Sequence, residues 1–450
     1  MTTITTLTTT ALDEKRPAIY EFDKVIVEQR ENIQSSTIEI PETQAPTEEL
    51  QAQPQPPSIT QRALLVHAAQ QPYALVTDHA IPDILHKDEI LIKIVAIGLN
   101  PVDWKGPAYS FGLPSLPWVN GRDLAGVIVD THAPHTTTES TTRLRKGDLV
   151  LVPSTDYRDI RKAAFQEYAV ATHFNAARIP GSTSPAPAAS AGVAFVASVL
   201  ALGVSLGLDF SGIQECAGPN LAEIVSRVDI ESIPLDVRGE CFASRNEIER
   251  PKKGEWIAIW GASTTTGLLT IQLARLAGLK TIAVADIARH GSKLHAAGAD
   301  ILIDRHDKAR AVEIIRGVTG NKLRFGIDIV GSETSTLLQA ALDSSIREDG
   351  SHAHLLGLTG LPKSDIQDER INYHTVPIKV FHSSPEIGEA MVVWLEKLME
   401  SRTLKLPEVV RADGGLEGIN EALEILKRGD ASGKRIVVEL DWYVCYTGGV

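Results

Sequence analysis

The chain has 450 residues, of which 43% are hydrophobic and 22% are charged, and its formal net charge is −13 at pH 7. This composition is that of a globular protein, and the length predicts two or three domains. The acidic balance argues against a nucleic-acid partner, because a protein that binds phosphate backbones needs a basic surface to neutralise them.

Features that indicate cellular location point to the cytoplasm. No apolar run reaches the roughly 18 residues that a membrane helix needs, so we expect no membrane contact. The three cysteines, Cys216, Cys241 and Cys445, are far apart, which argues against a disulfide framework and against a structural zinc lobe. The N-terminus shows no secretory signal, and Asp13 and Glu14 argue against a mitochondrial presequence.

Residues 1–60 are predicted to form a disordered tail. They begin with a threonine-rich run and end in a stretch rich in proline and glutamine (QAQPQPP). Such a composition cannot bury enough apolar surface to offset the entropy lost on ordering. Only residues 20–29 (YEFDKVIVEQ) have a strand-like pattern, which could add to a sheet edge or to a partner.

From Gln61 onward the sequence predicts a barrel-like β domain, because short strand patterns bounded by turns follow one another with little helix. The predicted strands cover residues 63–66, 89–98, 119–129, 149–152 and 165–171. We interpret residues 100–105 (NPVDWK) as a turn, since Pro101 biases Asn100 away from the helical conformation.

The middle of the chain changes to alternating helices and strands. Residues 187–208 predict one or two alanine-rich helices, and residues 209–251 are interpreted as an insertion with some local order. Apolar runs separated by helical patterns then predict a doubly wound parallel sheet, with strands over residues 256–260, 281–285, 299–303, 325–330, 352–356 and 376–381. Amphipathic helices over 386–400 and 416–427 and a last strand over 435–440 complete the chain.

The strand, turn and helix over residues 256–278 carry the clearest binding motif. Gly261 can bring the backbone close to a pyrophosphate, and a helix that starts near Thr265 points free N–H groups at it. The spacing G-x-S-x-x-x-G is one residue longer than the usual G-x-G-x-x-G of dinucleotide-binding units, so a turn without a ligand is the alternative. The candidate cofactor-binding residues of this loop are Gly261, Ser263, Thr264, Thr265, Thr266 and Gly267.

Eight segments, in order, resemble the medium-chain dehydrogenase/reductase superfamily. They are IKIVAIGLNPVDWK (92–105), GRDLAGVIV (121–129), KGDLVL (146–151), FQEYAV (165–170), WGASTTTG (260–267), AGAD (297–300), DIVG (328–331) and SGKRIVVEL (432–440). The resemblance implies an α/β protein. A GroES-like β-barrel catalytic domain would be built from residues 61–185 and 383–450, and a Rossmann domain of residues 186–382 would be inserted between them.

Two positions depart from the zinc-dependent members of this superfamily. Asn100 stands where they carry a cysteine, and Gly121-Arg122-Asp123 stands where they carry a G-H-E segment. The resemblance therefore implies a zinc-independent member, and we expect no metal site. Without a Lewis acid, reduction of an activated C=C is favoured over alcohol oxidation. We expect Arg122 to form a structural pair with Asp123.

Within the superfamily the chain most resembles fungal enoyl reductases that act in trans with polyketide synthases. In those proteins a lysine in the turn and a threonine on a later helix lie by the cofactor and substrate. Lys105 matches the lysine, but Ala197, beside Ser198, stands at the threonine position. The resemblance implies NADPH-dependent reduction of an enoyl-type acceptor in secondary metabolism. Lys105 and Asn100 are the candidate catalytic residues, an acyl thioester or other small molecule is the substrate, and a polyketide synthase is a candidate partner.

The end of the second strand of the dinucleotide-binding unit bears on the choice of cofactor. An acidic residue at this end usually pairs with a ribose 2′-OH, and here Asp286 follows Ala285, which occupies the usual position. Arg289, His290 and Lys293 come next and could hold a 2′-phosphate. Together with the resemblance these residues favour NADPH, whereas Asp286 leaves NADH open.

Two other functions remain open on the sequence alone. One is a quinone oxidoreductase of detoxification, which relative rates on a quinone and an acyl thioester would distinguish. The other is a non-catalytic dinucleotide-binding partner of a synthase, which Ala197 and the long tail favour. The histidines are scattered without ligand spacing, so we interpret them as ordinary surface or helix residues.

Overall fold

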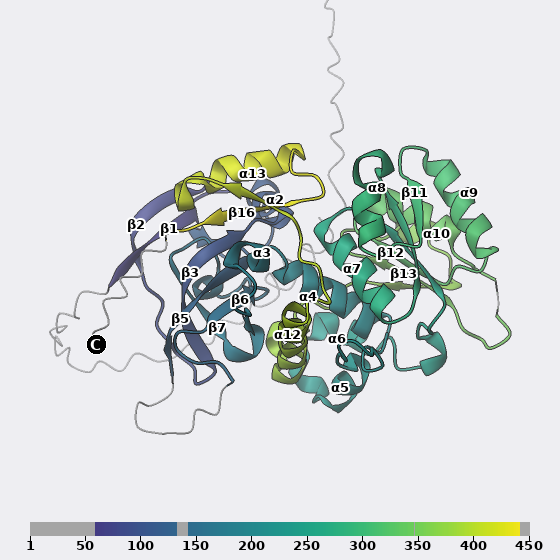
Figure 1. Ribbon diagram of the computed structural model, residues 1–450, viewed down its shortest axis with the longest axis horizontal. Coiled ribbons are helices and arrows are strands. Elements are labelled where there is room, and N and C mark those ends of the chain that lie inside the picture. Colours follow the sequence, from purple (N-terminus) through teal and green to yellow (C-terminus); the bar gives the residue numbers. More distant parts are fainter. Residues whose placement is uncertain (1–58, 133–142, 346, 442–450) are drawn as a thin grey trace, which may run out of the picture. The chain divides into compact units, whose positions relative to one another are not determined.

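The computed structural model describes residues 59–132, 143–345 and 347–441. The predicted disordered tail, up to residue 58, and its strand-like patch at residues 20–29 lie outside the described residues. The described chain forms three sheets with helices between and around them (Figure 1). None of its helices is long and apolar enough to cross a membrane.

Two sheets are built mainly from the first part of the described chain, and the larger one also takes in its two C-terminal strands. Their strands are β1 (Thr60–Val66), β2 (Ala74–Ala80), β3 (Glu89–Gly98), β4 (Trp118–Val119), β5 (Asp123–Thr131), β6 (Leu149–Pro153), β7 (Tyr168–Thr172), β8 (Ala177–Arg178), β15 (Val409–Ala412) and β16 (Arg435–Glu439). The smaller sheet has the order β2-β1-β4, and the larger has the order β15-β16-β3-β5-β6-β8, with β7 also paired to β3. The C-terminal strand β16 thus pairs antiparallel with β3 of the first part.

Strand β3 is the centre of the larger sheet. It pairs with β5, with β7 and with β16, so little of it faces solvent. Its sequence EILIKIVAIG is correspondingly an almost continuous apolar run rather than an alternating one. The sequence predicted this strand at its observed bounds for the same reason.

The third sheet is parallel throughout. Its strands are β9 (Trp256–Trp260), β10 (Lys280–Ala285), β11 (Ile301–Asp304), β12 (Phe325–Asp328), β13 (Ala353–Gly357) and β14 (Ile371–His374). The order is β11-β10-β9-β12-β13-β14, which is that of a Rossmann fold. The strand order reverses beside β9, so the switch point of this sheet lies at the carboxyl end of β9. The α/β class and the GroES-like plus Rossmann architecture are therefore confirmed.

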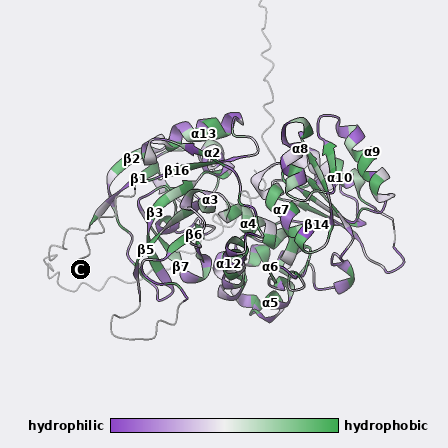
Figure 2. Ribbon diagram, viewed as in Figure 1, coloured by the Kyte–Doolittle hydropathy of each residue, from purple (hydrophilic) through white to green (hydrophobic). Residues whose placement is uncertain are grey.

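The helices connect and cover these sheets. They are α2 (Pro101–Tyr109), α3 (Pro185–Ala189), α4 (Gly192–Leu200), α5 (Leu221–Arg227), α6 (Leu235–Cys241), α7 (Thr265–Leu276), α8 (Ile287–Ala296), α9 (Lys308–Thr319), α10 (Ser332–Ala341), α11 (Val380–Ser383), α12 (Pro385–Glu400) and α13 (Ile419–Arg428). A π-helical turn, Ala201–Ser205, continues α4. Short 3₁₀ turns cover Ile160–Lys162, His173–Asn175, Ile230–Ser232, Glu247–Glu249, Ser364–Ile366 and Gly415–Gly418. Figure 2 shows that α9 and α13 carry both hydrophobic and hydrophilic residues, as helices with one buried face do.

The turn expected over residues 100–105 is wrong. Asn100 is extended, with φ −112° and ψ 150°, but it is the N-cap of α2, which starts at Pro101. Proline is favoured at the first helical position because its missing N–H would have no partner there. Pro101 therefore keeps Asn100 out of the helical conformation, as predicted, but it does not prevent the residues that follow from forming a helix.

Several other elements differ from the sequence predictions. The sixth parallel strand is β14, whereas the predicted 376–381 segment leads into α11. Pro377 lies within that segment and cannot donate to a strand ladder. The mostly exposed strand β2 and the edge strand β15 had no apolar alternation to identify them. Helices α5 and α6 confirm the local order expected within residues 209–251.

Helix α7 packs very closely on the loop that precedes it. A Cβ atom on Gly267 would lie 2.6 Å from the carbonyl oxygens of both Gly261 and Ala262. Neither backbone oxygen can move away without displacing the loop. Gly267 is therefore required for the approach of the helix to the end of β9, which is the packing role of the last glycine in a dinucleotide-binding turn.

We predict that Gly267→Ala lowers the free energy of unfolding by about 1–3 kcal/mol, because the added methyl overpacks against backbone. Chemical denaturation of the purified protein measures it. The matched control is Gly317→Ala in α9, where the added Cβ meets nothing within 4 Å. That change should stabilise by up to about 1 kcal/mol, the helix propensity gain of alanine over glycine. Equal effects of the two changes would contradict the packing role.

Candidate active site

The loop between β9 and α7 has the backbone geometry that the sequence motif predicts. Gly261 has a φ of +84°, a conformation that side chains disfavour. Thr264 is the N-cap of α7, and its Oγ1 accepts a hydrogen bond of 3.0 Å from the N–H of Gly267. Thr265 and Thr266 occupy the first two helical positions, whose N–H groups have no acceptor within a helix. This end of α7 can therefore bind an anion.

A buried hydroxyl pair ties α4 to the first turn of α7. The Thr270 hydroxyl donates to Thr266 O at 2.8 Å and lies 3.0 Å from Ser198 Oγ. Ser198 Oγ in turn lies 3.1 Å from Thr266 O. Ser198 thus links α4 to the first turn of α7 through Thr266 and Thr270. Its neighbour Ala197 is only partly buried.

Asp286 and Arg289 lie at the carboxyl end of β10, next to the switch point. Asp286 is the N-cap of α8, and its Oδ1 accepts a hydrogen bond of 3.2 Å from the N–H of Arg289. The Arg289 side chain is exposed. His306, which follows β11 and was not identified from the sequence, places its Nε2 at 3.9 Å from Asp286 Oδ2.

His290 and Lys293 lie further along α8, and both side chains already have partners. His290 is 5% exposed, and its Nε2 lies 3.0 Å from Ser432 Oγ. Lys293 Nζ donates to Gly433 O at 2.7 Å and lies 3.1 Å from a Glu408 carboxylate oxygen. The structure therefore brings these two predicted residues to the loop before β16, and not beside Asp286.

Lys105 lies in α2 beside an aromatic ring. Its Nζ is 5.7 Å from the Trp104 ring centroid, and Lys427 Nζ of α13 is 5.8 Å from the same centroid. Both distances are within the range of cation–π attraction. Lys105 as a whole is partly buried.

Asn100, the other candidate catalytic residue, belongs to a buried polar cluster with Asp123 and Arg435. Asn100 Nδ2 donates to Asp123 Oδ2 at 3.0 Å, and Arg435 Nη2 donates to the same oxygen at 2.8 Å. Arg435 Nη2 also donates to Asn100 Oδ1. The side chains of Arg435 and Asp123 are 6% and 0% exposed. Burial raises the pKa of Asp123, whereas the Arg435 cation and the Asn100 amide oppose that shift.

The same carboxylate fixes the start of α4. Asp123 Oδ1 accepts a hydrogen bond of 2.6 Å from the N–H of Val193 in the first turn. A Cβ on Gly192 would lie 2.3 Å from this oxygen, so the approach requires glycine. The expected pairing of Arg122 with Asp123 is wrong, because the ion-pair partner of Asp123 is Arg435 from the C-terminal strand.

Arg122 lies instead with a second buried group that sequence reasoning missed. Its guanidinium carbon is 5.6 Å from the Tyr157 ring centroid, and the nearby Asp103 and Tyr73 oppose the lowering of its pKa by burial. Burial raises the pKa of Asp103 to about 7. Asp103 accepts a 2.6 Å hydrogen bond from the N–H of Asn100 and so caps α2, while its Oδ1 has no partner among the described residues.

Comparison with known proteins shows which proteins the chain resembles in sequence and in fold. The family profile of the alcohol dehydrogenase GroES-like domain matches residues 86–181. A trans-enoyl reductase of Botryotinia fuckeliana is 27% identical over 368 residues, which are 78% of this chain and 92% of the relative. The trans-enoyl reductase eqxC of Fusarium heterosporum is 27% identical over 398 residues, 84% of this chain and 99% of the relative.

A solved structure completes the comparison. A putative NADPH:quinone reductase from Bacillus thuringiensis superposes with a TM-score of 0.64 at 16% identity, over 85% of this chain and all of that one. The chain is an enzyme that contains a GroES-like domain of the alcohol dehydrogenase type. It resembles the medium-chain dehydrogenase/reductases in fold and the trans-enoyl reductases in sequence over most of its length.

We predict that Arg435→Met lowers the free energy of unfolding by about 3–5 kcal/mol, because it leaves the Asp123 carboxylate buried without a cation. The loss should be smaller at acidic than at alkaline pH. Burial raises the pKa of Asp123, so the variant regains stability as this carboxyl takes up a proton. Chemical denaturation over a range of pH measures both effects.

The matched control is Arg411→Met in β15, since Arg411 forms an exposed pair with Glu439. Its effect should stay within about 1 kcal/mol. Adding Asp123→Asn to Arg435→Met should recover part of the loss. If Arg435→Met costs no more than Arg411→Met, the buried pair does not hold this part of the fold.

Proposed function

We propose that the protein is a zinc-independent reductase that transfers hydride from NADPH to the activated C=C of an enoyl-type acceptor. The observation that carries the proposal is the buried Asn100–Asp123–Arg435 cluster. A catalytic zinc needs thiolate, imidazole or available carboxylate ligands. Here the Asp123 carboxylate is already neutralised by a guanidinium and hydrogen-bonded at both oxygens. This donor set does not suit zinc, which supports a reaction that uses no Lewis acid at this site.

The β9–α7 loop fits a dinucleotide. Its positive-φ glycine, its close helix packing and the unused N–H groups at the start of α7 are the features that bind a pyrophosphate. When bound, the nicotinamide supplies the hydride. We assign the pyrophosphate to Gly261–Gly267 and the adenosine ribose to the end of β10. Exposed Arg289 supports NADPH, and Asp286 keeps NADH as the alternative.

Lys105 is the residue that we place at the reacting end. Addition of hydride to the β carbon of an α,β-unsaturated carbonyl develops negative charge on the carbonyl oxygen. A fixed cation or hydrogen-bond donor stabilises that oxygen. The Lys105 ammonium is the group proposed for this task or for holding the cofactor ribose. Asn100 and Asp103 act indirectly in this scheme, since they fix the N-terminus of α2 on which Lys105 lies.

The names of the relatives suggest the substrate class. The name trans-enoyl reductase points to a substrate with a conjugated double bond. From the sequence resemblance we add an acyl thioester, secondary metabolism and a polyketide synthase partner to the proposal, and from the composition a cytoplasmic location. The structural likeness to a putative NADPH:quinone reductase keeps a quinone as the second candidate acceptor. NADPH oxidation on an α,β-unsaturated thioester and on a quinone, compared at equal concentration, separates the two.

We predict that Lys105→Ala lowers kcat/KM for the preferred acceptor about 100-fold, the loss typical of removing one donor to a developing oxyanion. The decrease of NADPH absorbance measures it. The matched control is Lys427→Ala, because Lys427 stacks on the same Trp104 ring. That variant should keep its rate within about twofold. Equal losses would assign the effect to the tryptophan contact, and no loss in either would remove Lys105 from the proposal.

We predict that Arg289→Ala raises KM for NADPH about tenfold and leaves KM for NADH unchanged, because a charge-assisted hydrogen bond to a 2′-phosphate is lost. Initial rates with both cofactors measure the selectivity. Lys293→Ala serves as the control, since its amine is already bound by Gly433 O and Glu408. The assignment of Arg289 fails if Lys293→Ala alters selectivity and Arg289→Ala does not.

A further inference from the structure

A chain of buried carboxylates and imidazoles joins the insertion at residues 209–251 to the Rossmann sheet. It runs from Glu240 of α6 through His374 of β14 and His354 of β13 to Glu249. Glu240 Oε1 lies 3.0 Å from His374 Nδ1, His374 Nε2 lies 2.9 Å from His354 Nδ1, and His354 Nε2 lies 2.9 Å from Glu249 Oε2. The two rings are 4% and 3% exposed, so the expectation of ordinary surface or helix histidines is wrong here.

The number of protons in this chain follows from its three contacts. Each contact needs one hydrogen, because two lone pairs at 2.9–3.0 Å repel each other. Two ionised carboxylates and two neutral imidazoles supply only two hydrogens. If each imidazole donates to its carboxylate, the two remaining ring nitrogens face each other with no hydrogen between them. All three hydrogen bonds of this side-chain series can form only when it holds a third hydrogen.

The groups around the two imidazoles bear on which side chain holds this third proton. Glu249 also accepts hydrogen bonds from the N–H and the ring of His352. Although burial opposes it, the hydrogen bonds from His352 and His354 lower the pKa of Glu249. Burial and the charge of His374 lower the pKa of His354 to about 4. Glu249 and His354 therefore both disfavour the extra proton, and the geometry leaves it to the Glu240–His374 end of the chain.

Other charged or titratable groups face the chain. Arg324 approaches Glu249 Oε2 at 3.7 Å and is itself paired with Glu255 at 3.1 Å. Its guanidinium opposes protonation of His354. Burial raises the pKa of the Cys241 thiol, next to Glu240, to about 12, so this thiol stays neutral. None of these groups can supply the missing hydrogen to the contact between the imidazoles.

We propose that Glu240, His374, His354 and Glu249 form a proton-binding site, and that one bound proton fastens residues 235–249 to β13 and β14. The proton comes from solvent on folding and returns to solvent as the pH rises. When it leaves, the contact between the imidazoles becomes repulsive and the attachment weakens. The proposal does not depend on which acceptor the enzyme reduces.

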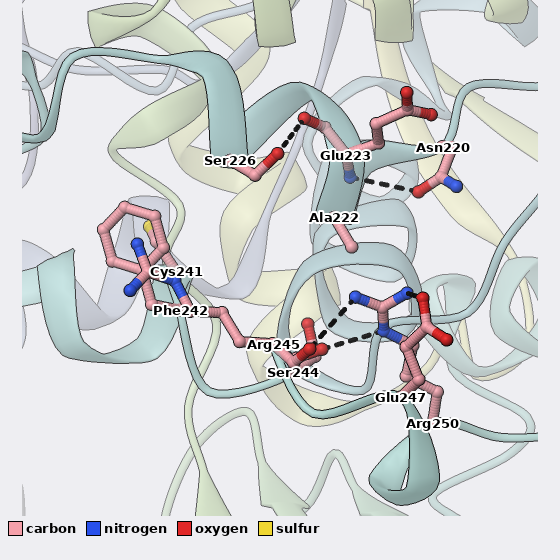
Figure 3. Close-up of a pocket in the computed structure, with 10 residues that line it drawn as sticks. All are labelled: Asn220, Ala222, Glu223, Ser226, Cys241, Phe242, Ser244, Arg245, Glu247 and Arg250. Carbon is pink, nitrogen blue, oxygen red and sulfur yellow. Dashed lines mark hydrogen bonds and ion pairs between the residues drawn. The ribbon is translucent and has the colours of Figure 1, made fainter.

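The attached segment lines one side of an open pocket of about 460 Å³, and residues around the start of α5 line the other side (Figure 3). Cys241 and Phe242 line it directly after Glu240, and Arg250 lines it directly after Glu249. Arg250 Nε donates to Ser244 O at 2.8 Å across its wall. The Glu249 end of this segment is also held by His352 and Arg324. Loss of the proton therefore weakens the attachment of the pocket wall chiefly at Glu240, whose only link to the sheet in this chain runs through His374.

The test measures hydrogen exchange of residues 235–249 in the full chain from about pH 6.5 to about 9.5. After correction for base-catalysed exchange, the opening constant of this segment should rise about tenfold per pH unit at the alkaline end, because one proton is lost on opening. In Glu240→Gln, the amide N–H donates to His374 Nδ1, and both imidazoles can then be neutral with every contact satisfied. This variant should show no pH dependence.

The matched control is Glu247→Gln, whose side chain is 86% exposed and outside the chain. It should keep the wild-type slope. The proposal is overturned if Glu240→Gln keeps that slope, or if the wild-type opening constant does not change with pH. Should Glu240→Gln fail to fold, nitrogen NMR of ¹⁵N-histidine in the wild type decides. Three of the four ring nitrogens of His354 and His374 should carry hydrogen near pH 7, and a count of two overturns the proposal.

Discussion

The buried pairing of Arg435 with Asp123 is the interaction on which the candidate active site depends. One carboxylate receives hydrogen bonds from the N-cap of α2, from the first turn of α4 and from the C-terminal strand β16. A buried ion pair adds little net stability over apolar packing, but any arrangement that separates its partners is heavily penalised. The pair therefore specifies how the C-terminal strand joins the first part of the chain.

Local pattern was sufficient to predict the elements with strong periodicity. Strand β3, strand β9 and helix α12 were found nearly at their observed bounds, because each is strongly apolar or amphipathic over its whole length. Prediction failed where a residue has two roles. Pro101 keeps the preceding residue extended and also begins a helix, so a turn and a helix start could not be distinguished. The exposed strand β2 offered no apolar alternation to find.

The candidate site was predictable only as far as its residues are neighbours in sequence. The Gly261–Gly267 motif is local, and its observed geometry follows from glycine and N-cap chemistry. Asp123 is 312 residues from Arg435 along the chain, so nothing local identified its partner. His290 and Lys293 are three positions apart on one helix face, and only the tertiary structure shows that this face meets residues 432–433. The pairing of His354 with His374 was likewise invisible, because it crosses between two strands.

The position of Asp286 has a consequence for any redesign of cofactor choice. Its carboxylate caps α8 as well as standing at the end of β10. On the proposed cofactor assignment, one side chain would therefore serve both selectivity and helix stability. Replacing an N-cap aspartate by alanine costs about 1 kcal/mol. Asparagine or serine would retain the cap without the negative charge. On the proposed cofactor assignment, a relaxed preference is therefore reachable at this position by a narrow set of substitutions. Substitutions of Arg289 leave the cap intact, because Asp286 bonds only its backbone N–H.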